Sequence, residues 1–386
     1  MNLDRFTSAL ADLETRGRRR RLVPRRIDGR FLVDDDGRRL LNFGSNDYLG
    51  FALASTPPSP STHNTNIAGS TASALVCGWT QQHHRLSESI AVLESTESAV
   101  LFPSGFAACS GTIATLAAPG DLILSDALNH ASLIDGCRLS KADVVVYPHG
   151  DVAFVQQQLQ QTARPGQRVW IVTDSIFSMD GDIAPLADLV EVAQRYDADL
   201  IVDEAHGTGL FGQAGSGVVE MLGLKNEIAV RIGTLSKAVG AQGGFVAGPQ
   251  AVIDYLVNHC RPLIFSTSLS AGAVAAAQRS IDQIRSDPQP RVHVRRLSRR
   301  LREAIGQQCG PDEPAAEVPI IIHVVGSDSA ATQASSELRQ AGFYVPAIRP
   351  PTVPAGTARL RISLSAIHTD EDVDHLASAL SRLTKA

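Results

Sequence analysis

The chain has 386 residues, of which 44% are hydrophobic and 19% charged, and its formal net charge is −5. This length exceeds what one compact core usually holds, so we expect about two or three domains. The composition is typical of a globular enzyme, and the acidic balance argues against a nucleic-acid-binding protein. We expect no signal peptide and no membrane span, because the sequence has no sufficiently long apolar stretch.

The first 26 residues combine a predicted helix with a basic cluster. Large apolar side chains recur at helical spacing at Leu3, Phe6, Leu10 and Leu13. The arginines of residues 16–26 could form a nucleic-acid or targeting patch, but the acidic residues before them argue against a transit peptide. Five scattered cysteines without a CxxC pair predict neither a disulfide framework nor a metal site, and indicate a reduced, cytoplasmic protein.

Short apolar runs alternate with helical stretches from about residue 85 to 250. Before them, extended segments are expected at 31–33 and 39–41, and a loop at 51–68. The expected helices are 85–94, 105–117, 131–139 and 185–196. The apolar runs are 99–102, 122–124, 144–147, 169–172, 200–202 and 244–247. This alternation predicts an α/β fold with a mostly parallel sheet that is buried on both faces.

The last third of the chain predicts a smaller α+β domain. A long helical region covers about 270–307, with a shift in composition near residues 286–288. Strand-like runs at 320–325 and 358–364 follow, with helices near 328–341 and 370–384. We therefore predict an N-terminal helix and extended segment (1–42), a large domain (43–285) and a small C-terminal domain (286–386).

A lysine and an aspartate point to pyridoxal phosphate (PLP). Lys237 lies 34 positions after Asp203, which ends an apolar run. A lysine that forms a Schiff base with PLP usually has a carboxylate partner for the pyridinium nitrogen. An acid that ends an apolar run lies at a strand tip, where open α/β sheets bind ligands. A lone lysine is more often a solvated surface residue, but the surrounding motifs favour the cofactor.

Two turns offer contacts for the phosphate of PLP. Ser104, Gly105 and Phe106 open a predicted helix after an apolar run, and a helix N-terminus suits an anion. Thr234 and Ser236 add hydroxyl donors just before the lysine.

The remaining polar positions each allow two interpretations. His130 begins a helix, where it either stacks on the cofactor or bonds to the backbone. His206 either contacts the phenolic oxygen of PLP or is structural. Asp174 and Ser178, in the polar loop after another apolar run, are candidates for a wall of the site.

One motif favours a different cofactor. Residues 207–212 spell GxGxxG after a predicted strand, as in dinucleotide-binding proteins. The glycine-rich residues 213–217 follow, so no helix is expected to begin at the motif, and no strand ends in an acid at the required distance. An NAD-dependent dehydrogenase is therefore a remote alternative.

Several stretches resemble one enzyme family. They are 45–50, 104–106, 130–132, 177–181, 203–209, 234–237 and 349–361. Together they resemble the α-oxoamine synthases, PLP-dependent enzymes with the fold of aspartate aminotransferase (fold type I), from about residue 16 to the end. The tail at 350–354 favours the members that condense L-alanine with a pimeloyl thioester in biotin biosynthesis. Members of the 5-aminolevulinate synthase and 2-amino-3-ketobutyrate CoA ligase types are alternatives, and a non-catalytic PLP-fold protein is a remote one.

The resemblance implies catalytic roles. Lys237 is the Schiff-base lysine and the acid/base, Asp203 pairs with the pyridinium nitrogen and His130 stacks on the ring. His206 and Ser178 contact the phenolic side.

The resemblance also implies substrate contacts and a homodimer. Arg359 clamps the substrate carboxylate, and Asn46, Arg20 and Thr352 are further substrate-binding candidates. Residues 266–267 (Ser266 and Thr267) reach the phosphate from the partner subunit. His83 is an additional candidate after the segment 69–78, which departs from the family's glycine-rich pattern. Coenzyme A and acyl carrier protein both stay open as the acyl carrier.

Overall fold

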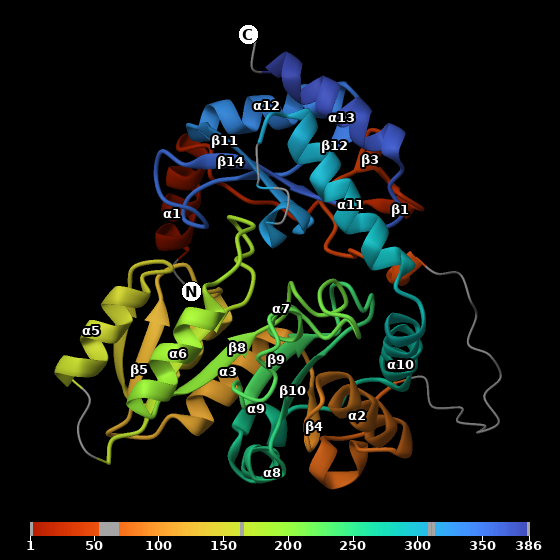
Figure 1. Cartoon of the computed structure of the whole chain (residues 1–386). Helices are drawn as coiled ribbons and strands as arrows, with labels where there is room; N and C mark the ends of the chain where they lie inside the picture. The colour runs from red at the N-terminus through yellow and green to blue at the C-terminus, as the bar shows by residue number, and fades with distance from the viewer. Residues whose placement is uncertain (1–2, 54–68, 163–165, 308–309, 311–312, 384–386) are drawn as a thin grey trace. The chain divides into compact units, whose positions relative to one another are not determined.

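The computed structural model describes residues 3–53, 69–162, 166–307, 310 and 313–383 (Figure 1). The chain divides into two compact units. The larger unit comprises residues 49–178 and 182–292, and the smaller unit comprises 1–48, 179–181 and 293–386. The N-terminal segment is thus part of the smaller unit, whereas the sequence suggested a separate segment over 1–42. It belongs there because strand β3 (Arg39–Asn42) pairs with β12 (Phe343–Tyr344), near the other end of the chain.

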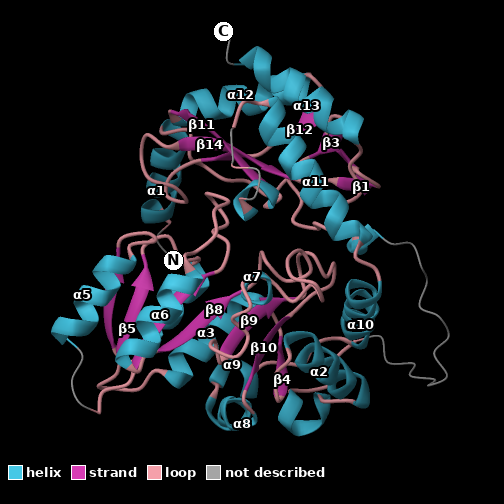
Figure 2. Ribbon diagram, in the orientation of Figure 1, coloured by secondary structure: helices cyan, strands magenta, loops and turns pink. Residues whose placement is uncertain are grey.

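The larger unit is built on a seven-stranded sheet with the order β4-β10-β9-β8-β7-β5-β6 (Figure 2). Its strands are β4 (Ser98–Phe102), β5 (Leu122–Asp126), β6 (Asp143–Tyr147), β7 (Val169–Asp174), β8 (Asp199–Asp203), β9 (Val230–Thr234) and β10 (Gly244–Gly248). Strands β5 to β9 run parallel, and only β10 runs against both of its neighbours. The predicted α/β fold with a mostly parallel sheet is confirmed.

Helices accompany nearly every strand of this unit. They are α2 (Gln81–Glu94), α3 (Gly105–Leu116), α4 (Ala131–Leu139), α5 (Val152–Thr162), α6 (Leu186–Tyr196), α7 (Val218–Met221), α8 (Gln250–His259), α9 (Arg261–Ile264) and α10 (Ala271–Ser286). Short helical turns cover Phe51–Leu53 and Ala74–Gly78, while residues 54–68 of the predicted loop lie outside the described residues. Because helices cover the sheet, strands such as β7 are buried at every residue, which explains their continuous apolar sequences.

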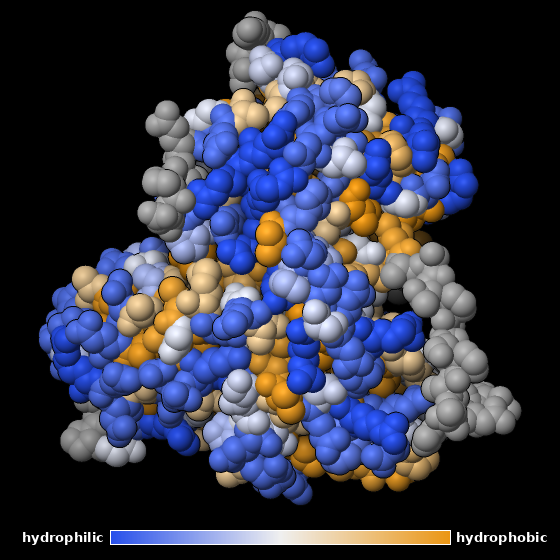
Figure 3. Space-filling view, turned by 45° about the vertical axis from the view of Figure 1, so that its right-hand side comes forward, coloured by the Kyte–Doolittle hydropathy of each residue, from blue (hydrophilic) through white to orange (hydrophobic). Residues whose placement is uncertain are grey.

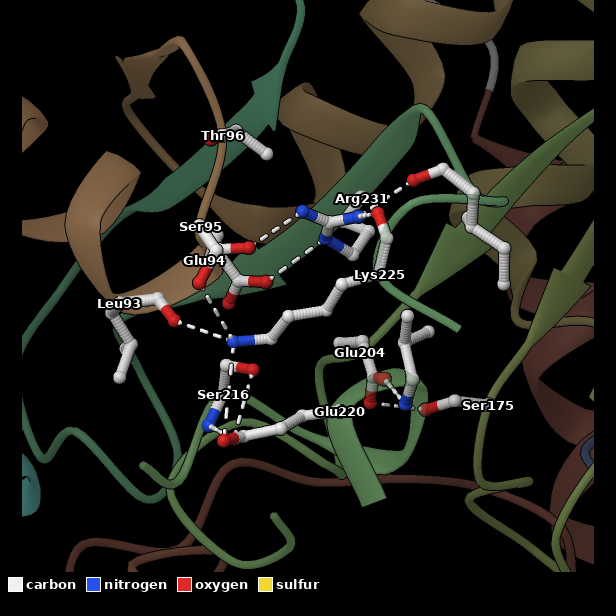
Figure 4. A network of polar contacts seen from close by, with 12 residues as sticks. Leu93, Glu94, Ser95, Thr96, Ser175, Glu204, Ser216, Glu220, Lys225 and Arg231 are labelled. Carbon is white, nitrogen blue, oxygen red and sulfur yellow. Dashed lines mark hydrogen bonds and ion pairs between the residues drawn. The ribbon is translucent and has the colours of Figure 1, made fainter. Parts of the chain in front are cut away.

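Strand β9 was not predicted, because Arg231 interrupts its apolar pattern. The Arg231 side chain is 1% exposed, and its Nε lies 3.1 Å from Glu94 Oε2 at the end of α2 (Figure 4). Its guanidinium also donates to the carbonyl oxygens of Glu94, Lys225 and Ile228. Burial raises the pKa of Glu94 to about 7, against the opposing charge of Arg231. A buried cation in a strand is tolerated here because its donors have acceptors.

The smaller unit contains two sheets. One has the order β1 (Arg26–Asp28), β2 (Phe31–Val33), β3 and β12; the other has the order β11 (Ile320–Gly326), β14 (Ala358–Ser363) and β13 (Ala347–Ile348). Its helices are α1 (Asp4–Thr15), α12 (Asp328–Gln340) and α13 (Asp370–Leu383), with a 3-10 turn at Pro314–Glu317, and α11 (Gln289–Ala304) begins in the larger unit. The predicted long helix over 270–307 is two helices, because Pro288 stands between them and cannot continue the first.

The surface is ordinary for a globular protein. On the face in Figure 3, hydrophilic residues dominate and hydrophobic ones form scattered patches. The predicted amphipathic helix is α1, although none of its residues is buried. Within the described ranges, every helix is too short or too polar to span a bilayer.

Candidate active site

The candidate cofactor residues of the larger unit gather at one edge of its sheet. The parallel strands β5, β7, β8 and β9 end there, at Asp126, Asp174, Asp203 and Thr234. Gly244, at the start of β10, pairs with the last residues of both β4 and β9, so the turn after β4 reaches the same edge. Open α/β sheets bind ligands beyond the carboxyl ends of their strands.

Lys237 and His206 meet at this edge. The Nζ of Lys237 lies 2.8 Å from Nε2 of His206. Lys237 belongs to the turn after β9, where its carbonyl oxygen accepts a hydrogen bond from Gly240. His206 belongs to the turn after β8 and is 4% exposed. The fold therefore places the amine of Lys237 beside a buried imidazole.

Asp203 is buried and held in one orientation. Its Oδ1 accepts the N–H of Ala205 at 2.8 Å, and its Oδ2 accepts the thiol of Cys109 at 3.2 Å. Burial, together with the charge of Asp203, raises the pKa of the Cys109 thiol, so the thiol stays protonated and donates. Cys109 was not predicted as a site residue, because a contact between residues 94 positions apart leaves no local pattern.

His130 caps helix α4 and also faces the charged groups of the site. Its Nδ1 lies 2.7 Å from Ser132 Oγ, and its backbone N–H donates to Asp174 Oδ2 at 2.7 Å. Burial lowers the pKa of His130, and the charge of Lys237 adds to this effect against that of Asp203. The ring is therefore neutral. Its local bonds leave its face for packing, so the two interpretations from the sequence are compatible.

The turn after β4 forms a cradle for an anion. Ser104 is the N-cap of α3 and accepts the N–H of Ala107 at 3.1 Å. The first-turn N–H groups of Gly105 and Phe106 have no acceptor within the helix. A Cβ on Gly105 would lie 3.1 Å from the side chain of Thr234, so the backbone approaches β9 closely. This cradle follows β4 and the hydroxyl of Ser236 follows β9, the two strands that pair with β10.

The donor set fits PLP. The amine of Lys237 can bond the aldehyde carbon of PLP, and the imidazole of His206 can bond its phenolic oxygen. The buried carboxylate of Asp203 suits the ring nitrogen, and the N-terminus of α3 suits the phosphate. The chain thus supplies one group for each polar part of the cofactor.

Three other predicted residues lie in loops of the same unit. Ser178 is partly exposed in the turn after β7. Ser266 and Thr267 lie between α9 and α10, where Thr267 forms a bridge with Ser73. His83 is buried in α2, and its ring bonds the carbonyl oxygen of Leu269 and the cap residue of that helix.

In the smaller unit, two arginines on β14 have different partners. Arg359, the predicted carboxylate clamp, already has a carboxylate: its Nη1 lies 2.5 Å from Asp180 Oδ1 and 2.9 Å from the carbonyl oxygen of Met179. Arg361 is also buried, and its Nη1 donates to Asn46 Oδ1 at 3.1 Å. Asn46, a predicted substrate residue, is therefore grouped with Arg361 and not with Arg359.

Two further substrate candidates are brought together from distant parts of the sequence. The Nη2 of Arg20 donates to the hydroxyl of Thr352 at 3.0 Å, and both side chains are exposed.

The GxGxxG stretch is not a nucleotide-binding turn. No helix begins at residues 207–212, and the next helix, α7, starts at Val218. A Cβ on Gly207 would lie 1.9 Å from the Glu204 carboxylate, and one on Gly212 would lie 2.1 Å from that of Glu220. Both carboxylates are bonded within the fold, to Ser175 and Ser216 respectively (Figure 4). The glycines make room for the carboxylates of Glu204 and Glu220, which explains the motif without a dinucleotide.

Comparison with known families agrees with this site. The family model for class I and II aminotransferases matches residues 38–380, and the chain belongs to this family of PLP-dependent enzymes. Its curated relatives include 8-amino-7-oxononanoate synthases. One, from Lysinibacillus sphaericus, is 41% identical over 99% of this chain and 98% of its own length. Another, from Marinobacter nauticus, is 44% identical over 90% of this chain and 88% of its own length.

Solved structures carry the same fold. The serine palmitoyltransferase of Sphingomonas wittichii superposes with a TM-score of 0.90 at 31% identity, covering 99% of this chain and 97% of that one. A serine palmitoyltransferase from S. paucimobilis with bound PLP superposes with a TM-score of 0.87 at 28% identity, with the same coverage. The predicted resemblance to α-oxoamine synthases, the fold type and the cofactor, PLP, are thereby confirmed.

Proposed function

We propose that this chain catalyses the reaction of its curated relatives: the decarboxylative condensation of L-alanine with a pimeloyl thioester. The products are 8-amino-7-oxononanoate, an intermediate of biotin biosynthesis, carbon dioxide and the free thiol. The observation that carries the proposal is the grouping of Lys237, His206 and Asp203 at the strand ends, in a chain 41–44% identical to synthases of this name. A cytoplasmic homodimer, in which Ser266 and Thr267 reach the partner's cofactor, is part of the proposal.

Separate residues of the chain hold the cofactor, transfer the proton and set the charge of the ring nitrogen. When bound, PLP supplies an electron sink for negative charge at the amino acid's α-carbon. Lys237 holds the cofactor and then removes and returns the α-proton, with His206 bonded to its amine. Asp203, fixed by Ala205 and Cys109, keeps the ring nitrogen protonated. The neutral ring of His130 would pack on the face of the cofactor.

We assign the alanine carboxylate to Arg361 and Asn46 in place of Arg359. The guanidinium of Arg359 is neutralised by Asp180, so a second carboxylate there would face a like charge. The Nη1 of Arg361 donates to Asn46 Oδ1 and Ser363 Oγ, which are uncharged acceptors, and a guanidinium can bind a carboxylate through two hydrogen bonds. The Arg20–Thr352 pair is our candidate contact for the acyl substrate.

The test is product analysis by mass spectrometry. The purified protein with PLP is given alanine, serine or glycine, and pimeloyl, shorter dicarboxylic or palmitoyl thioesters on either coenzyme A or acyl carrier protein. We expect 8-amino-7-oxononanoate from alanine and pimeloyl thioester, and nothing from the Lys237→Ala variant. Product formed only from serine and a palmitoyl thioester would assign the chain to the activity of its structural neighbours.

A further inference from the structure

His149 bridges two carboxylates outside the groups assigned above. It follows β6, and its Nδ1 lies 3.0 Å from Asp126 Oδ1 at the end of β5. Its Nε2 lies 2.8 Å from Asp182 Oδ2, in the turn after β7. Asp126 is almost fully buried and also accepts the N–H groups of Leu128 and Gly150. One end of the bridge is therefore fixed to the sheet.

The bridge requires the charged form of the imidazole. A carboxylate only accepts hydrogen bonds, so both ring nitrogens must donate, and only the imidazolium carries two N–H groups. The charged groups that face the ring are Asp126 and Asp182; Tyr147, beside Asp126, is neutral because burial raises the pKa of its hydroxyl. Burial opposes the charge of His149, but the two carboxylates outweigh it and raise its pKa.

The other end of the bridge closes a tight turn. Ile176 and Ile183 form a bridge across the base of this turn, and the N–H of Phe177 donates to the carbonyl oxygen of Asp182 at 3.1 Å. The ring of Phe177 packs edge-on against His149, with centroids 4.4 Å apart. Ser178 follows directly, so the imidazole contacts both the residue before it and the residue that closes the turn.

We propose that His149 is a positioning residue: its imidazolium ties the turn 176–183 to the end of β5 and thereby fixes Ser178 at the cofactor site. Loss of the proton leaves one N–H. The remaining N–H stays bonded to Asp126, because a buried charge without a partner costs more than an exposed one. The Asp182 side chain, which is 41% exposed, then loses its hydrogen bond to the ring and is solvated by water. The consequence for Ser178 rests on the proposed function, whereas the bridge itself does not.

The experiment measures the turn directly, in the full chain without cofactor or substrate. Hydrogen exchange of peptides that cover 176–183 is followed across pH, each rate being divided by its intrinsic rate, and the His149 ring is titrated by NMR. Variants are His149→Gln, Asp182→Asn and His84→Gln; His84 pairs with Glu88 on the exposed face of α2 and is the matched control.

We expect protection of the turn to fall about tenfold above the pKa of His149, the order expected for one charge-assisted hydrogen bond. His149→Gln and Asp182→Asn should have this low protection at every pH, and His84→Gln should behave as wild type. PLP affinity, measured by absorbance, should fall several-fold in both turn variants. Unchanged protection in both variants, or a His149 pKa below its usual range, would overturn the proposal. A chain that makes no amino ketone but shows the pH-dependent protection would refute the proposed reaction alone.

Discussion

Nζ of Lys237 and Nε2 of His206 lie 2.8 Å apart, on turns that follow the neighbouring parallel strands β9 and β8. One of the two nitrogens must donate and the other accept, so the lysine and the histidine do not both carry a positive charge. A lysine so placed exchanges a proton without having to reach bulk water, which suits a residue that must act as both base and acid.

Lys237→Ala should leave a folded protein that binds PLP only non-covalently and has no turnover, because within the described part of the chain no other lysine lies in the turns that follow these strands. Borohydride reduction followed by peptide mapping should find the cofactor on Lys237 in the wild type and on no residue in the variant. Lys141→Ala, at an exposed position, is the control and should be labelled normally. A labelled lysine other than Lys237 contradicts the assignment.

Asp203→Asn should slow exchange of the alanine α-proton by about 100-fold or more, because the ring nitrogen loses the charge that keeps it protonated. Cys109→Ala retains this charge and removes only one donor, so its effect should be several-fold. Proton NMR of alanine in heavy water measures both. Near-normal exchange in Asp203→Asn would remove this residue from the mechanism.

Arg361→Ala should weaken alanine binding by about 10- to 100-fold, as expected for loss of charge-assisted hydrogen bonds. Arg361→Lys should bind alanine more tightly than Arg361→Ala but more weakly than the wild type, since an ammonium cannot make the bidentate contact of a guanidinium. Arg359→Ala should have the smaller effect, because its guanidinium is bonded to Asp180 and Met179. Alanine titrations of the variants, followed by the absorbance of the cofactor, show which of the two arginines binds the alanine carboxylate. A larger loss in Arg359→Ala would reinstate Arg359 as the clamp.

Arg231→Met should lower the free energy of unfolding by about 3–5 kcal/mol, because Glu94 is left buried without its cation. Burial already raises the pKa of Glu94 to about 7 in the wild type, and removal of Arg231 should raise it further. Near pH 6 Glu94 is mostly neutral in both proteins, whereas near pH 8 only the wild type gains from the ion pair. The loss in the free energy of unfolding should therefore be smaller near pH 6 than near pH 8. Urea unfolding at the two pH values measures this. The double variant with Glu94→Gln should recover part of the loss; no recovery would mean that the charge of Glu94 is not the cause.

His368 should make the smaller unit sensitive to acid. Its ring stacks on Phe43, accepts the N–H of Ser365 and donates to the carbonyl oxygen of Asn42, and burial lowers its pKa to about 4. The unfolded chain therefore binds the proton more readily, so stability is complete above about pH 6.5 and falls as pH drops towards 4, by up to ~3 kcal/mol. Urea midpoints across this range should have a shallower slope in His368→Gln. An unchanged slope would show that another group controls the acid sensitivity.

The sheet was predictable because parallel strands buried on both faces have continuous apolar sequences, and Asp203 was recognisable as the polar residue that ends one of them. Strand β9 was not predicted, because Arg231 interrupts that pattern and the hydrogen-bond acceptors of Arg231 lie up to 137 positions away in the sequence. Arg359 and Arg361 could not be separated, because two arginines in one short strand look equivalent until their partners are known. The bridge formed by His149 joins three separate turns and has no local pattern at all.

The chain passes between its two units four times, after residues 48, 178, 181 and 292. On the ribosome, residues 49–292 are therefore complete before the C-terminal part of the smaller unit exists. Leu41 must wait for Phe343, its partner in the β3–β12 pair, until the whole of the larger unit has been made. The segment that precedes the larger unit therefore completes its sheet late, and a nascent chain stopped at residue 292 would hold a finished seven-stranded sheet and a strand β3 that still lacks its neighbour β12.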